Sequence, residues 1–144
     1  MMMFLIAFLF FQSSENQITV EHQWARAAEK GMNSGIFMNI KNNTDLPDTL
    51  VSAESEAAEV TEVHETYDAG SGMMGMRKAG KLGIKSGNEL ILKPGSYHIM
   101  LIGLKKDLVK GESVKINLVF SKSGKIEITC PIKVLNPKMM KMKS

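Results

Sequence analysis

The sequence predicts an all-β protein, folded as an antiparallel Greek-key β-sandwich or barrel. Three observations lead to this fold class. Apolar and polar residues alternate along nearly every periodic stretch, as they do in strands with one buried face. Clusters of Gly, Pro, Asn and Ser separate these stretches at short intervals. No helical segment long enough to connect parallel strands lies between them, so neighbouring strands are expected to be antiparallel.

The elements expected in the first half of the chain follow from this alternation. Ile18, Val20 and Trp24 share one side of the first strand, and Ile36 alternates with Met38 in the second. The expected strands here cover residues 18–24, 35–41, 49–53, 60–67 and 73–78, with turns at 42–47 and 70–72. Residues 54–59 are rich in Ala and Glu and are expected to form a short helical turn.

The second half shows the same period. Expected strands cover residues 89–93, 96–102, 114–120 and 125–134, and turns are expected at 86–88, 94–95, 110–111 and 123–124. Cys130, the only cysteine, lies on an apolar face of the last strand. A single cysteine excludes an internal disulfide and a Cys-x-x-Cys site, so we expect Cys130 to be a buried packing residue.

Length and charge indicate one domain of residues 15–136 between two short terminal segments. Residues 1–14 are uncharged and apolar, which is typical of a secretory signal peptide and indicates export to the periplasm. No basic residue precedes Arg26, so a membrane-tethering leader stays an alternative. The formal charge of +3 equals the contribution of three lysines in the tail, residues 137–144, which is expected to be disordered. A near-neutral domain argues against a nucleic-acid partner.

Histidine and methionine carry the chemistry of this chain. Strand alternation places His98 and Met100 on one face and Ile99 on the other, with about 7 Å between the first two at ~3.3 Å per residue. Met73, Met74 and Met76 lie among glycines, where a surface loop gives thioethers little benefit from burial. Imidazole and thioether ligands together suit the soft ion Cu(I) better than zinc, calcium or magnesium.

His64 is the other candidate ligand, near the end of its expected strand. Its register is ambiguous, and a surface histidine beside carboxylates is the alternative interpretation. Either Glu62 or Glu65 could accept the hydrogen bond of its ring, and the sequence does not say which nitrogen would bind a metal.

These residues resemble the periplasmic PCuAC-type copper chaperones, whose signature is a histidine, a methionine of a Met-x-Met pair and a His-x-Met. Eleven residues separate His64 from Met76, one more than in the family pattern, and the twenty-one between Met76 and His98 match it. Similarity also covers the stretches Trp24-Ala-Arg-Ala and Leu92-Lys-Pro-Gly-Ser-Tyr-His, and extends over about residues 18–134.

The resemblance implies a cupredoxin-like domain that binds one Cu(I) through His64, Met76, His98 and Met100. Because no nucleophile with an adjacent base and no convergent pair of carboxylates stands out, and four filled ligand positions leave no place for a substrate, we expect a carrier and not an enzyme. The carrier is expected to be a monomer. Its partner would be a copper-accepting protein, either subunit II of cytochrome c oxidase, with its CuA centre, or another copper chaperone. Auxiliary copper ligands are expected among Met73, Met74, Met139, Met140 and Met142.

Three alternatives stay open at this level. An exported β-sandwich interaction module could carry these residues incidentally, and a copper storage or tolerance protein could use the same ligands. A copper oxidase or reductase is less consistent with the sequence, because the sequence shows neither the cysteine-containing ligand set of blue-copper sites nor a second metal site.

Overall fold

The computed structural model describes residues 16–135, and its regular secondary structure is entirely β, so the predicted all-β class is confirmed. Within that range no helix of the length and apolarity needed to span a membrane occurs. The ten strands are β1 (Ile18–Arg26), β2 (Ser34–Asn42), β3 (Asp48–Glu54), β4 (Ala58–Gly70), β5 (Met73–Lys78), β6 (Leu82–Ile84), β7 (Glu89–Leu92), β8 (Tyr97–Leu104), β9 (Ser113–Phe120) and β10 (Gly124–Lys133).

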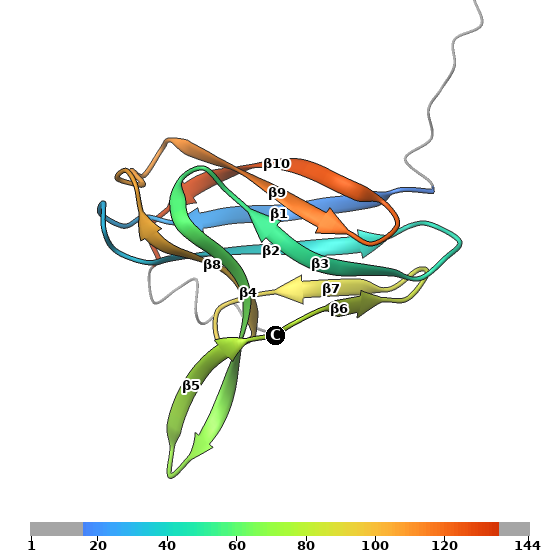
Figure 1. Ribbon diagram of the computed structural model, residues 1–144, viewed down its shortest axis with the longest axis horizontal. Helices are drawn as coiled ribbons and strands as arrows, with labels where there is room; N and C mark the ends of the chain where they lie inside the picture. Colours follow the sequence, from blue (N-terminus) through green and yellow to red (C-terminus); the bar gives the residue numbers. More distant parts are fainter. Residues whose placement is uncertain (1–15, 136–144) are drawn as a thin grey trace, which may run out of the picture.

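The strands form two layers joined through β1 and β10 (Figure 1). One layer has the order β5-β4-β8-β2-β1, with β7 also paired to β2, and the other has the order β10-β9-β3-β6. The pairs within each layer are antiparallel, as expected. The β1–β10 pair is parallel, with Ala25 opposite Ile132, which the sequence analysis did not anticipate.

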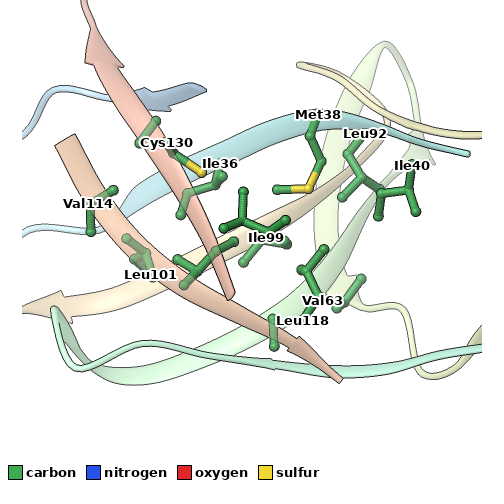
Figure 2. Close-up of a cluster of buried hydrophobic side chains, with 14 of the residues drawn as sticks. Ile36, Met38, Ile40, Val63, Leu92, Ile99, Leu101, Val114, Leu118 and Cys130 are labelled. Carbon is green, nitrogen blue, oxygen red and sulfur yellow. The ribbon is translucent and has the colours of Figure 1, made fainter. Parts of the chain in front are cut away.

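The core lies between the two layers. Figure 2 shows side chains of β2, β4 and β8 facing side chains of β9 and β10. Ile36 and Met38 of β2 are buried, so Met38 is an ordinary strand residue as predicted. Cys130 is also fully buried, and burial raises the pKa of its thiol to about 12. It is therefore a packing residue with a protonated thiol at neutral pH.

The helical turn expected over residues 54–59 is not formed. Instead, β3 continues to Glu54 and β4 begins at Ala58. The hydroxyl of Ser55 accepts a hydrogen bond from the N–H of Ala57 at 3.2 Å and donates one to the carbonyl of Lys115 at 2.9 Å. A tight turn fixed by a serine side chain replaces the helical turn, because strand pairing on both sides leaves only three residues for the connection.

A long hairpin of β4 and β5 projects from the body of the molecule (Figure 1). The paired part runs from His64 opposite Lys78 to Gly70 opposite Met73. Gly70 and Gly72 have φ values of 89° and 75°, which is the left-handed region that glycine adopts without a steric penalty. The glycines therefore make the reversal that returns β5 along β4, and β5 carries the methionine cluster with it.

Candidate metal centre

The two candidate histidines lie side by side on adjacent strands. His64 of β4 is directly opposite His98 of β8, and their ring centroids are 6.0 Å apart in an edge-to-face arrangement. Met100 follows two residues after His98 and therefore lies on the same face of the sheet. On the other face, Val63 and Ile99 form the next cross-strand pair and are buried in the core. Tertiary pairing thus removes the register ambiguity of His64.

Aromatic side chains cover this outer face. The ring of Phe37 packs against Trp24 at 4.7 Å and lies 6.2 Å from the ring of His98. Only 4% of His98 is exposed. Gly35 leaves room for the phenyl ring, because a Cβ at that position would come within 2.9 Å of Phe37 Cζ. The covering residues thus hold His98 in a largely apolar setting.

A small pocket of about 100 Å³ opens beside His98. Met76 and Met100 line it together with His98, Arg26 and Thr66, whereas His64 is not among its lining residues. The volume suits a single ion better than an organic substrate. A larger cleft of about 710 Å³ lies elsewhere, between Glu56, Lys105 and Lys115, and its lining within the described residues includes neither histidine nor methionine. The smaller pocket is therefore the better candidate metal site.

Each imidazole has one nitrogen in a hydrogen bond and one without a partner. The Nδ1–H of His98 donates to the carbonyl of Ser96 at 3.0 Å, and Nε2–H of His64 donates to a carboxylate oxygen of Glu62 at 2.8 Å. His98 Nε2 and His64 Nδ1 are buried and unpartnered in the part of the chain that the structure describes. Buried polar atoms are normally paired. Two adjacent lone pairs without donors are the arrangement expected of metal ligands.

Burial lowers the pKa of His98 below its ordinary value of 6.5. The hydrogen bond to the carbonyl of Ser96 opposes this shift in the pKa, and electrostatic interactions with His64 and Arg26 add to it. A lower pKa keeps the ring neutral, and only a neutral imidazole has a lone pair free for a metal.

Of the predicted methionines, the structure brings Met76 and Met100 to the pocket. Met76 is 61% exposed, so a ligand at this position would be accessible from solvent. Met73 and Met74 are exposed near the end of the hairpin and do not line the pocket. Met139, Met140 and Met142 lie outside the described residues.

Residues 16–135 contain no group of three or more His, Cys, Asp or Glu side chains that could hold a metal. Sequence reasoning missed Arg26, Phe37 and Thr66 as residues around the pocket. Arg26 belongs to the Trp24-Ala-Arg-Ala stretch that supported the resemblance, which was the available signal.

Of the two carboxylates considered for the His64 hydrogen bond, Glu62 makes it. Glu65 instead accepts a hydrogen bond from Arg77 at 2.6 Å, and the Arg77 guanidinium lies 4.4 Å from the centre of the Tyr67 ring. Glu65 thus belongs to the hairpin and not to the histidine pair.

Comparison with known proteins gives matches over most of the chain. The sequence profile of the family "LpqE-like: Putative lipoprotein LpqE-like" matches residues 18–132. The "Putative lipoprotein Lxx21020" of Leifsonia xyli subsp. xyli (strain CTCB07) is 35% identical over 117 residues, which cover 81% of this chain and 69% of that protein.

Solved structures with the same fold include PCuAC domains. The apo PCuAC domain from PmoF1 is 27% identical with a TM-score of 0.71, covering 85% of this chain and 98% of that domain. The Cu(I) form of DR1885 from Deinococcus radiodurans is 29% identical with a TM-score of 0.60, covering 79% and 78%. The copper-bound PCuAC domain from PmoF2, at 22% identity and a TM-score of 0.69 over 85% and 97%, shares the fold. These matches confirm the resemblance and the cupredoxin-like fold predicted from the sequence.

Proposed function

Because this chain belongs to the LpqE-like family and is similar to PCuAC domains, we propose that it is a copper chaperone that binds one Cu(I) ion. The proposed ligands are His64, Met76, His98 and Met100. The observation that carries the proposal is a buried, unpartnered nitrogen on each of two neighbouring imidazoles, one of which, His98, lines a pocket together with two thioethers.

The ligand chemistry supports Cu(I) as the cargo. Thioether sulfur is a soft donor that contributes little to zinc or magnesium binding but suits Cu(I). Bonds from imidazole nitrogen to a metal are about 2 Å long in the well-studied case of zinc, so one ion can lie between two rings whose centroids are 6.0 Å apart. All four ligands are neutral, so the bound ion would keep its single positive charge.

The uneven exposure of the ligands supports transfer rather than storage. His98 is nearly buried on the sheet, whereas Met76 is exposed on the projecting hairpin. A partner could displace Met76 first and then take the ion by stepwise ligand exchange. Four filled ligand positions leave no place for a substrate, so the proposed role is that of a carrier and not of an enzyme.

The proposed setting is an exported protein, periplasmic or tethered to a membrane like a lipoprotein. Support comes from the apolar residues 1–14 and from the lipoprotein description of its relatives. The proposed recipient is the CuA centre of cytochrome c oxidase subunit II, and the proposed working form is a monomer.

A Cu(I) titration in competition with bicinchoninate tests the binding proposal. Met76→Leu and Met100→Leu keep side-chain volume but remove a sulfur ligand, so each should weaken Cu(I) binding roughly tenfold or more. Met32→Leu is the matched control, because Met32 is an exposed methionine that does not line the pocket. Equal affinities for all three variants and the parent protein would refute the site and favour an interaction module.

Transfer is tested by mixing the Cu(I)-loaded protein with a soluble, copper-free CuA domain of subunit II. Appearance of the CuA absorption, with loss of copper from the carrier, is the expected result. Retention of copper on this chain under the same conditions would contradict delivery to CuA and favour a storage or tolerance role.

A further inference from the structure

We propose that Glu62 is a positioning residue that sets the tautomer of His64, so that Nδ1 and not Nε2 offers its lone pair to the metal. This inference rests on the proposed copper site. It adds a residue that is not itself a ligand and assigns the binding atom of one histidine.

The geometry of β4 places Glu62 and His64 on one face of the strand, two residues apart. The Glu62 carboxylate lies 2.8 Å from His64 Nε2. An ionised carboxylate can only accept hydrogen bonds, so Nε2 must carry the proton. A neutral imidazole has one N–H, and His64 Nδ1 is therefore left with a free lone pair.

No other group competes for this role in the described part of the chain. His64 Nδ1 is buried and has no hydrogen-bond partner there. Glu65 lies on the opposite face of β4 from His64 and is held by Arg77. Glu62 is therefore the group that fixes both the proton and the orientation of the His64 ring.

The two histidines are hydrogen-bonded through different ring nitrogens, Nε2 in His64 and Nδ1 in His98. The backbone carbonyl of Ser96 accepts the Nδ1–H of His98, which leaves Nε2 of that ring free. The acceptor for His98 belongs to the backbone, so substituting the side chain of Ser96 would leave it in place. The acceptor for His64 is a side chain, so substituting Glu62 removes it. A carboxylate hydrogen-bonded to a ligating histidine also raises the basicity of the ring, and loss of such a partner typically lowers metal affinity by 10- to 100-fold.

Nitrogen-15 NMR of the copper-free full chain tests the tautomer directly. At about pH 8.5, where imidazoles are neutral, His64 should show a protonated Nε2 and an unprotonated Nδ1. The Nε2-bound proton should be visible in the parent protein and in Glu62→Gln, whose amide oxygen still accepts, and should be lost by solvent exchange in Glu62→Ala. A proton found on Nδ1 of His64 in the parent protein would overturn the inference.

Copper affinity provides the second measurement. Glu62→Ala should weaken Cu(I) binding about 10- to 100-fold, and Glu62→Gln should restore most of the loss. Glu59→Ala is the control, because Glu59 is exposed on the other face of β4, and it should leave affinity unchanged. Unchanged affinity in Glu62→Ala, with Cu(I) still bound by the parent, would refute this inference alone. A parent protein without Cu(I) affinity would instead refute the proposed function, and the NMR result would still decide the tautomer.

Discussion

The fold opposes protonation of His98. Burial is the main reason that its pKa lies below 6.5, and electrostatic interactions with His64 and Arg26 add to the effect. A proton and a metal compete for the same nitrogen. The lowered pKa therefore extends the pH range in which the ring is available to a metal towards acidic values.

A pH titration of the copper-free protein by NMR should give His98 a midpoint below 6.5. The unfolded chain binds a proton at this position more readily than the folded one, so the free energy of unfolding should decrease as pH falls from about 6.5 through the lower folded-state pKa. Urea denaturation at several pH values measures this decrease. A His98 midpoint at or above 6.5 would contradict the burial argument.

At the level of single residues, the sequence predicted which face of a strand a side chain occupies better than it predicted hydrogen-bond partners. Alternation correctly placed Ile99 toward the core, where it is fully buried, and His98 on the opposite face. It could not choose between Glu62 and Glu65, because either register of β4 was compatible with the pattern. The choice depends on the pairing of β4 with β8, which is a long-range contact and leaves no local signal.

The hairpin of β4 and β5 depends on a close contact between Gly75 and Tyr67, which lie opposite each other. A Cβ at position 75 would come within 2.6 Å of the Tyr67 ring, and the Arg77 guanidinium packs on the same ring. The absence of a side chain at Gly75 therefore lets the tyrosine cross β5 and hold the hairpin that carries Met76.

Gly75→Ala should displace Tyr67 and destabilise the protein by about 1–3 kcal/mol, the usual cost of overpacking. If Met76 binds copper, Cu(I) affinity should also fall, because the hairpin would no longer hold its position. Gly83→Ala is the matched control: this glycine also lies in a strand, but a Cβ there would have nothing within 4 Å. Chemical denaturation and the bicinchoninate competition measure the two effects, and equal behaviour of both variants would contradict the role given to Gly75.

Long alternating strands were predictable, and short or strongly constrained elements were not. The strand around Cys130 has a clear period-two burial pattern. The three-residue β6, with Gly83 at its centre, has too little sequence to show a period and forms because β3 offers an edge. The turn at Ser55 was interpreted as helical because its Ala and Glu neighbours have helical propensity, which tertiary pairing overrode.

The candidate site and the core share a strand: β8 carries His98 and Met100 on one face and contributes Ile99 to the core between the two layers. We therefore expect the stability of the core to support the site. Ile99→Ala should lower the free energy of unfolding by about 2–5 kcal/mol, since it leaves a cavity at the centre of the sandwich. Ile91→Ala is the control, because Ile91 is 45% exposed on β7. Urea denaturation of both variants measures the difference, and similar losses would argue against a single core that supports the site.

At the scale of the whole molecule, the layered architecture followed from the sequence, but the way the layers are joined did not. Alternation along residues 18–24 and 125–134 identifies buried faces and carries no information on the direction of a neighbouring strand. The parallel pairing of Ala25 with Ile132 brings together parts of the chain that are more than 100 residues apart. Such contacts are decided by the closure of the complete fold.

The pocket lies at the C-terminal end of β1, away from the end at which this strand begins. Ile18 lies at one end of this nine-residue strand and Arg26, which lines the pocket, at the other. At ~3.3 Å per residue the strand is a spacer of roughly 25 Å. An attachment to a surface through residues that precede Ile18 would therefore hold the pocket at a distance from that surface, where a second protein could reach it from the solvent side.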